Sequence, residues 1–275
     1  MTTTEPVDAW SRRHLVIVLG IVAAAATVLI AALAYAVSTA YTSHTTTSER
    51  PISSDALVRT FPTSAVGVRG QAYREEVAAA PMMPVTVDDL KPAAPAAGPA
   101  PTIAVPPATK AGPAQVPTGF AHTPEGAAGQ LGAIDSTVLT GMSIAQARSV
   151  YARWAMPGAA DFTDWEMTAN LQNFHASAGT TDGDLAVIVT AVPVAAQIKG
   201  VDGPDWVLAC VLYDIKAQVT DEARIGYGRC EHMQWSGGRW MIAPGTPPAA
   251  APSTWPGSQR SMDAGWRTWV EDGDH

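Results

Sequence analysis

The stretch RIGYGRCEHMQWSGGRWMIAP, residues 224–244, contains the signals that decide the fold. Its segment SGGR predicts a two-residue hairpin turn with Gly237 and Gly238 at the centre, because glycine accepts the backbone angles that such turns require. The turn places Trp235 opposite Trp240, which is a favourable aromatic pair on one face of an antiparallel sheet. We therefore expect this stretch to form the last hairpin of a sheet.

The strand before this hairpin is expected to be WVLACVLYDIKAQ, residues 206–218. If the intervening turn is centred on Thr220, Cys210 lies directly opposite Cys230. The same register pairs further residues on the face shared with Trp235, namely Val207 with Met233, Tyr213 with Tyr227, and Ile215 with Ile225. A shift by one residue would move all of these side chains to the other face, so the pattern specifies one register.

The segment TGFAHTPEGAAGQL, residues 118–131, predicts the start of a helix. Thr123 is suited to cap this helix, Pro124 to its first position, and Glu125 to the positive end of its dipole. Phe120 can pack on the first turn as a hydrophobic staple. Apolar residues then recur on one face, at Ala127, Leu131, Ile134 and Val138. The segment therefore has first of all a structural role.

Two more helices and a strand are expected between this helix and the hairpins. Ser143 caps the second helix, which ends at Pro157, and the third begins at Asp161 with an apolar surface broad enough to lie across a sheet. The strand LAVIVTAVPVAAQI, residues 185–198, follows, and Pro193 inside it implies an edge position or a bulge. The predicted class is α+β, with helices packed on an antiparallel sheet.

A membrane anchor is predicted near the N-terminus. The 23 residues from Leu15 to Val37 carry no charge and would span about 34 Å as a helix, enough for a hydrocarbon core of roughly 30 Å. Arg12 and Arg13 precede this span and no Lys or Arg follows before Arg50, which predicts a cytoplasmic N-terminus and an exported remainder. The alternative is a cleaved twin-arginine signal, but its apolar region would be unusually long.

The rest of the chain divides by composition. Residues 1–13 are expected to form a cytoplasmic tail, 14–40 the anchor, and 41–117 a long disordered linker, first Ser/Thr-rich and then Pro/Ala-rich. Residues 118–244 form the predicted extracytoplasmic domain and 245–275 a loose Pro-rich tail. That tail contains Trp255, Trp266 and Trp269, which are costly to expose and either pack back on the domain or bind a partner.

The two cysteines, Cys210 and Cys230, are the only ones in the chain. Facing positions on neighbouring strands, in an exported domain, favour a disulfide between them. Closing a loop of about 20 residues would stabilise the fold by roughly 3 kcal/mol in the chain-entropy model. A metal site that includes His232 is the alternative, but it lacks a fourth ligand and a zinc-like spacing.

The sequence contains no recognisable catalytic constellation. GxSxG, HExxH, P-loop and GxGxxG motifs are absent, and Asp214 alternates to the sheet face opposite Tyr213 and Tyr227. The histidines lie apart in the sequence, at a helix start (His122), near a helix end (His175) and on the second hairpin strand. A net charge of −8 and a pI near 5.1 disfavour a nucleic-acid partner. We expect neither catalysis nor a cofactor or metal; a cavity lined by paired polar groups would reverse that expectation.

The segment TGFAHTPEGA, residues 118–127, resembles the GFAxTPEGA opening motif of an uncharacterised family of actinobacterial membrane-tethered domains that accompany conjugative and integrative elements. The pattern W-SGG-RW-MIAP is similar to the last hairpin of NTF2-like and cystatin-like exported domains. This resemblance implies helices packed on a curved antiparallel sheet.

It also implies a single-pass membrane protein whose domain is a non-catalytic docking or assembly module. The expected setting is conjugation, type IV-like secretion or another cell-envelope complex, with the lipid bilayer and envelope proteins as partners. The alternative is a module that binds a ligand or cell-wall component in an NTF2-like cavity.

Overall fold

The computed structural model describes residues 67–182, 188–218 and 222–272 of the 275-residue chain. The predicted anchor, Leu15–Val37, and the first part of the predicted linker lie outside the described residues. Among the helices within the described ranges, none combines the length and the hydropathy needed to cross a membrane.

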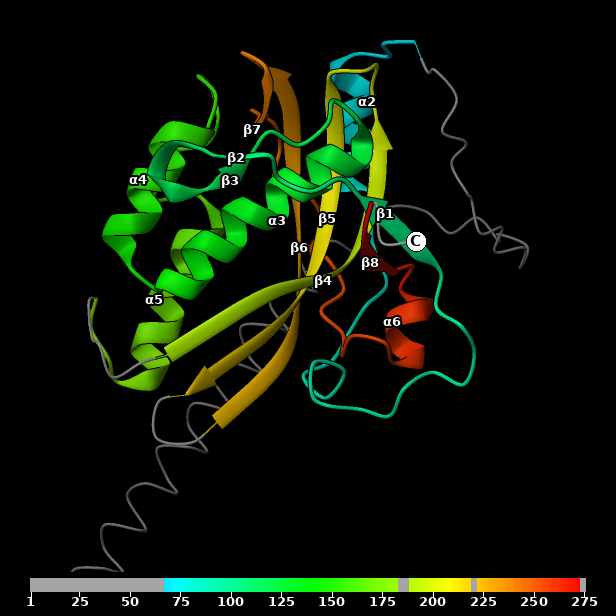
Figure 1. Ribbon diagram of the computed structural model, residues 1–275, viewed down its shortest axis with the longest axis vertical. Coiled ribbons are helices and arrows are strands. Elements are labelled where there is room, and N and C mark those ends of the chain that lie inside the picture. Colours follow the sequence, from blue (N-terminus) through cyan, green and yellow to red (C-terminus); the bar gives the residue numbers. More distant parts are fainter. Residues whose placement is uncertain (1–66, 183–187, 219–221, 273–275) are drawn as a thin grey trace, which may run out of the picture. The chain divides into compact units, whose positions relative to one another are not determined.

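A curved six-stranded sheet forms the centre of the described domain (Figure 1). In spatial order its strands are β1 (Thr102–Val105), β8 (Arg267–Glu271), β4 (Ile188–Val201), β5 (Trp206–Gln218), β6 (Glu222–Ser236) and β7 (Arg239–Ile242). All neighbours are antiparallel except β1 and β8. A small second sheet contains β2 (Lys110–Ala111) and β3 (Pro117–Thr118), joined through the 3-10 turn η1 (Pro113–Gln115). The predicted α+β class with helices on a curled sheet is confirmed.

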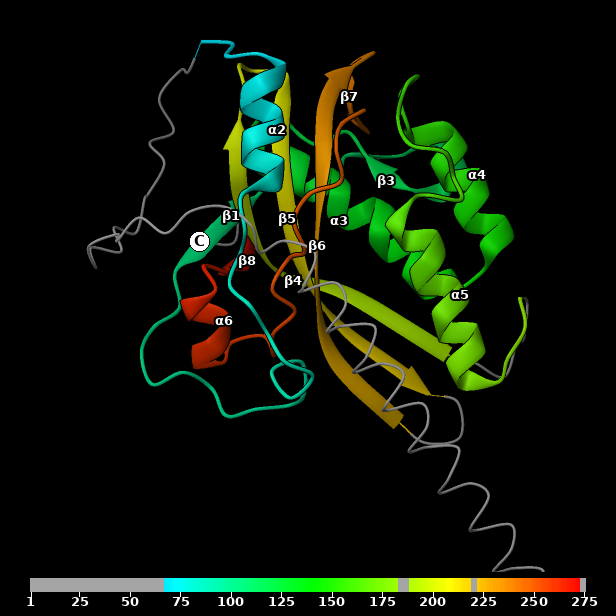
Figure 2. The ribbon, with the colours of Figure 1, turned by 180° about the vertical axis from the view of Figure 1, so that it is seen from behind.

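Both faces of the main sheet are covered. One face packs against α3 (Pro124–Gly141), α4 (Ile144–Trp154) and α5 (Glu166–Ala178), which form the larger apolar core with it. The other face is covered by α2 (Gln71–Ala79) and by the C-terminal segment that contains α6 (Gln259–Asp263), as seen from behind in Figure 2. The near-continuous apolar run at the start of β5 fits a strand that is buried on both sides.

The predicted strand register is confirmed. Cys210 lies opposite Cys230 and Trp235 opposite Trp240, and all three further predicted pairs are present. The strand that contains Pro193 lies between β5 and β8, but β8 pairs only with Ala195 and Ala196, so Pro193 itself is paired on the β5 side alone. The register with β5 also shifts directly after the proline, which is the predicted bulge.

The first two predicted helix starts are also confirmed. The Thr123 side chain accepts a hydrogen bond from the Gly126 amide at 3.1 Å, and the Ser143 side chain caps α4 in the same way. The third helix begins at Glu166 instead of Asp161. Asp161 starts a turn, in which its carbonyl oxygen accepts from the Trp165 amide, before the helix begins.

Residues 67–117 pack on the domain, so the prediction of a loose linker is wrong for this part of the chain. At its start, Asp202 accepts hydrogen bonds from the amides of Arg69 and Gly70 and from Arg74 Nε at 2.6 Å, which anchors the N-terminal end of α2. Directly after the C-terminal end of α2, the carbonyl oxygen of Ala80 accepts a hydrogen bond from Lys199 Nζ at 2.7 Å. Proline and alanine give no periodic signal, but here specific polar contacts hold the segment in place.

Replacing Asp202 with alanine is expected to release α2 while the main core stays folded. Its carboxylate is buried and would leave two amides and a guanidinium without their acceptor, a loss of about 1–3 kcal/mol. Hydrogen exchange of residues 71–79 should then accelerate tenfold or more. Replacing the exposed Asp88, whose carboxylate pairs with Lys91, is the control and should leave that exchange unchanged. Equal hydrogen exchange of residues 71–79 in the two variants would contradict the role of Asp202 in holding α2.

The C-terminal residues 245–272 are also folded, which corrects the prediction of a loose tail. Trp266 is buried and donates from Nε1 to the Pro252 carbonyl oxygen at 2.9 Å. Trp269 packs against α3, while Trp255 stays partly exposed with the Arg224 guanidinium 4.9 Å from its ring centre. Of the two alternatives for these tryptophans, packing on the domain holds for Trp266 and Trp269.

Glycines on β6 make room for this C-terminal segment. A Cβ at Gly226 would overlap the carbonyl oxygen of Thr254, and one at Gly228 would approach the Trp266 ring to 2.9 Å. The spacing of two glycines on one face of a strand is typical of a site where another backbone approaches closely.

Candidate functional site

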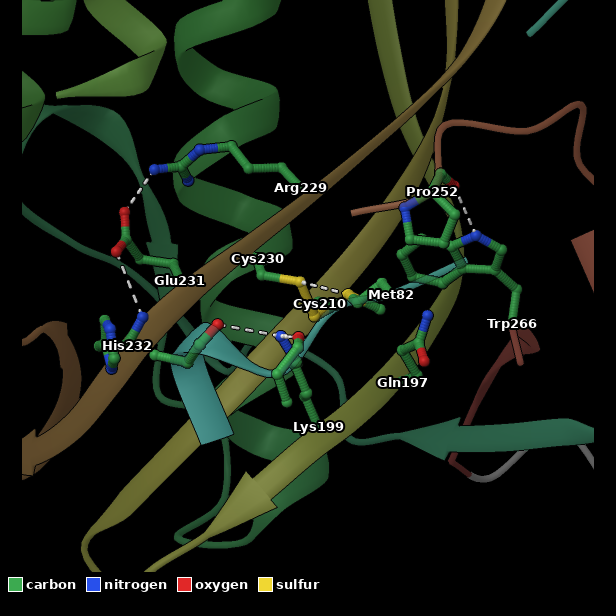
Figure 3. Close-up of a disulfide and its surroundings, with 12 residues drawn as sticks. Met82, Gln197, Lys199, Cys210, Arg229, Cys230, Glu231, His232, Pro252 and Trp266 are labelled. Carbon is green, nitrogen blue, oxygen red and sulfur yellow. Dashed lines mark hydrogen bonds and ion pairs between the residues drawn. A yellow bond between two sulfur atoms is a disulfide. The ribbon is translucent and has the colours of Figure 1, made fainter. Parts of the chain in front are cut away.

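The most unusual feature of the domain is a buried ion cluster between the helices and the sheet. Arg229 of β6 is 1% exposed, and its Nη1 donates to both carboxylate oxygens of Asp135 on α3, at 2.9 and 3.0 Å. Its Nη2 donates to Glu231, two residues further along the same strand. Arg229 and the neighbouring Cys230 lie on opposite sides of β6 (Figure 3). One guanidinium therefore faces two carboxylates in the interior.

Two neutral groups complete the inner part of the cluster. Tyr213 of β5 donates from its hydroxyl to Asp135 at 2.9 Å, and Trp165 donates from Nε1 to Glu231 at 3.2 Å. Within the described residues, Arg229 Nε is buried without a hydrogen-bond partner; the nearest carboxylate, that of Glu166, is 3.9 Å away. All but one of the guanidinium nitrogens are thus committed to side chains.

The cluster reaches the surface at the start of α5. The Glu166 side chain is 60% exposed, and the Tyr227 hydroxyl lies 3.5 Å from it and accepts a hydrogen bond from Asn170 at 2.6 Å. Tyr151 packs against Trp165 with ring centres 4.7 Å apart. Aromatic rings and a hydrogen-bonded rim therefore separate the buried carboxylates from solvent.

The electrostatics of the cluster favour a proton on Asp135. Burial raises the pKa of Asp135 to about 6, although Arg229 and the Tyr213 hydroxyl act in the opposite direction. Burial tends to lower the pKa of Arg229, yet its two carboxylate partners raise it well above its ordinary value, so the guanidinium stays charged. Two buried carboxylates beside one cation leave an excess negative charge that a proton can neutralise.

The protonation of Asp135 predicts a pH dependence of stability. Because its pKa is higher in the folded domain than its ordinary value of 3.8, the folded state binds this proton more tightly. The resulting stabilisation is complete below about pH 4 and is lost as the pH rises through about 6, a decrease of the order of 2–3 kcal/mol. The free energy of unfolding, measured with denaturant from pH 4 to 7.5, should show this decrease relative to Asp135→Asn. If the free energy of unfolding changed with pH in the same way in the parent chain and in Asp135→Asn, the raised pKa would not belong to Asp135.

The cluster includes Tyr213 and Tyr227, which the predicted register places on the face shared with Trp235, and Arg229 and Glu231, which the sequence analysis does not single out. Arg229 and Glu231 alternate with Tyr227 on the face that packs against the helices, and this alternation was the available signal. Asp135 comes from α3, 94 residues earlier in the chain, so no local pattern indicates that it joins them. These polar groups are buried and paired with one another.

The predicted disulfide joins Cys210 and Cys230 in the structure. Both residues are buried on the face covered by α2, and Met82 Sδ lies 3.7 Å from Cys230 Sγ (Figure 3). His232 is engaged elsewhere, with Nε2 2.7 Å from the Thr246 carbonyl oxygen. Among the described residues, no group of three or more potential metal ligands is present. The metal alternative therefore has no support in this part of the chain.

The remaining candidate residues have surface or structural positions. Asp214, whose side chain is 18% exposed, pairs with Arg224. His175 contacts the Met142 carbonyl oxygen at 2.7 Å and thereby links the ends of α5 and α3.

The TGFAHTPEGA motif connects the start of α3 to the last hairpin through direct contacts. Trp240 Nε1 donates to the Ala121 carbonyl oxygen at 3.0 Å, and Gly126 leaves space for the same carbonyl. The His122 ring stacks on Trp235 at 4.2 Å, and its Nε2 lies 2.8 Å from Asp205. The motif and the W-SGG-RW hairpin, separated by more than 100 residues in sequence, therefore form one structural unit.

Comparison of the chain with protein-family models, with curated proteins and with solved structures found no match.

Proposed function

We propose that this chain is a single-pass membrane protein whose folded domain, residues 67–272, acts outside the cytoplasm as a non-catalytic docking or assembly module. The setting that fits best is conjugation, type IV-like secretion or another cell-envelope complex. The uncharged span Leu15–Val37 with its preceding arginines supports the anchor and its orientation. The disulfide supports an oxidising compartment, because such bonds are rare in the cytoplasm.

The observation that carries the docking role is that the polar groups between the helices and the sheet are buried and bonded to one another. A module that binds a ligand in an NTF2-like cavity needs space between helices and sheet, and an enzyme needs accessible acid and base groups there. In this domain Arg229, Asp135 and Tyr213 are buried and bonded to one another at that position. Recognition is then left to the outer surface, which is how a docking module works.

Affinity co-isolation from native cells tests this function. Tagged full-length chain, solubilised with mild detergent, should recover a defined set of envelope proteins. A variant that lacks residues 67–272 but retains the anchor is the control for association through the membrane segment alone, and it should lose those proteins. Recovery of the same proteins with the truncated chain, or of none with the full chain, would overturn the proposal.

A further inference from the structure

Strand β1 leaves one edge of the six-stranded sheet open. It is the first strand in the spatial order, and its only strand partner among the described residues is β8. The edge is short, because Pro101 precedes the strand and Pro106 follows it. Prolines and short strands are the usual means by which proteins limit unwanted pairing, so what remains open here is a segment of four residues.

The hydrogen bonds to β8 identify the groups that point outward. The amides of Thr268 and Asp272 donate to the carbonyl oxygens of Pro101 and Val105, at 2.7 and 3.0 Å. Successive residues of a strand direct their N–H and C=O groups to alternate sides, so the odd-numbered residues of β1 form the hydrogen bonds with β8. The N–H and C=O groups of Thr102 and Ala104 therefore point away from the sheet, and both residues are exposed.

A hollow of about 370 Å³ lies along this strand, towards the start of α3. Its lining comes from β1, from the ends of β8 and from the α3 start: Ile103, Ala104, Pro106, Ala121, Thr123, Glu125, Arg267 and Asp272. Ile103 is buried and forms its apolar floor. An extended backbone on the edge of β1 would thus run beside a depression that can receive a side chain.

The charges around the hollow indicate which side chain fits. Glu125, Arg267 and Asp272 line it, and none of them is in an ion pair within the described ranges. Two carboxylates and one guanidinium leave a net negative rim. A basic side chain between the carboxylates is complementary to this rim, and an acidic one would be repelled by it.

We propose that the open edge of β1 pairs with an extended segment of a partner protein that places a Lys or Arg side chain in this hollow. This inference rests on the proposed docking role and assigns that role to the surface formed by the β1 edge and the hollow. Two exposed residues offer two donors and two acceptors, so the contact alone gives an affinity roughly in the micromolar to millimolar range. Attachment of both partners to the same membrane raises the effective concentration and makes such a short contact sufficient.

A substitution that removes one outward-pointing N–H group of β1 tests whether this edge pairs with a partner segment. Ala104→Pro deletes the outward N–H and keeps the carbonyl and amide groups of Ile103 and Val105 that face β8. Ala104→Val is the matched control, because it keeps the N–H and favours a strand. Each is made in the full-length chain with a photo-crosslinking amino acid at Thr102 and expressed in native cells. Mass spectrometry of the crosslinked peptide identifies the partner segment.

The expected result is a crosslink to a segment with a basic residue, at a similar level in the parent chain and Ala104→Val and at least tenfold lower in Ala104→Pro. Equal crosslinking in the proline variant, or capture of an acidic segment, overturns the edge proposal. If envelope proteins still co-isolate with the proline variant, the docking role survives that failure; if they co-isolate with no variant, both fail.

A second variant keeps the test decisive if Ala104→Pro does not fold, which rapid digestion of residues 67–272 in limited proteolysis would reveal. Glu125→Lys reverses a charge on the rim and leaves the β1 backbone unchanged. We expect it also to lower the crosslink at least tenfold. A crosslink that is unaffected by this reversal would overturn the assignment of a basic partner side chain.

Discussion

Replacement of Arg229 by leucine is expected to lower the free energy of unfolding by about 3–5 kcal/mol, the cost of breaking a buried ion pair from one side. The substitution leaves Asp135 and Glu231 buried without their cation. Part of the loss should be recovered at pH 5, because burial raises the pKa of Asp135 to about 6 in the parent chain and removal of the Arg229 charge raises it further. Chemical denaturation of the oxidised protein at pH 5 and 7.5 measures both effects.

Arg224→Leu is the matched control for that experiment. Arg224 lies on the same strand, but its side chain is 48% exposed, so water screens its pair with Asp214, whose side chain is 18% exposed. A surface pair of this kind contributes less than about 1 kcal/mol. If the two leucine variants were equally stable, the buried cluster would not be an important part of the folded state, and the account of the domain interior would be wrong.

Removal of the disulfide has the second large expected effect. Replacing both Cys210 and Cys230 with alanine should lower the free energy of unfolding by roughly 3 kcal/mol, because the bond closes a loop across 20 positions in the unfolded chain. The two cavities left in the core facing α2 add to this loss.

Reduction of the parent protein provides the internal comparison. Denaturation with and without a reductant should differ by about the same roughly 3 kcal/mol in the parent chain and by nothing in the double-alanine variant. Native oxidised protein should not react with thiol reagents, since its two cysteines are joined in the disulfide. A parent chain that is equally stable when reduced would show that the bond adds no stability.

The sheet and its register could be predicted from sequence because several constraints agree on one solution. The two glycines at the hairpin turn fix Trp235 opposite Trp240, and the register expected for a turn centred on Thr220 sets Cys210 opposite Cys230. Helix caps are similarly local, so Thr123 and Pro124 identified the start of α3. Such signals depend only on near neighbours in the chain.

The chain segments that flank the predicted domain could not be assigned in this way. Residues 67–117 and 245–272 contain many prolines and alanines and no sustained periodicity, and their contacts with the sheet involve positions far away in sequence. The amide of Gly226, for example, donates to the Leu90 carbonyl oxygen. The signals that were available came from the sheet itself: the unbroken apolar run of β5, which requires a cover on both faces, and the glycine pair on β6.

Only part of the candidate site could be predicted from the sequence. Arg229 and Glu231 are charged residues at core-facing positions of β6, which is a reason to expect buried partners. Asp135 follows directly after Ile134 on the α3 face that was read as apolar, and nothing in its surroundings distinguishes it from a helix-surface carboxylate. The pairing depends on how α3 crosses the sheet, and that is a property of the tertiary structure.

Crosslinking of intact cells with a membrane-impermeant, amine-reactive reagent tests the proposed function most directly. The four lysines of the chain, Lys91, Lys110, Lys199 and Lys216, all lie in the folded domain, so the reagent reports on that domain from outside the cell membrane. The account predicts lysine-specific crosslinks from this domain to a small, reproducible set of envelope proteins. Lysines that react only after lysis would contradict the exported position, and lysines that react in intact cells without any protein partner would contradict docking.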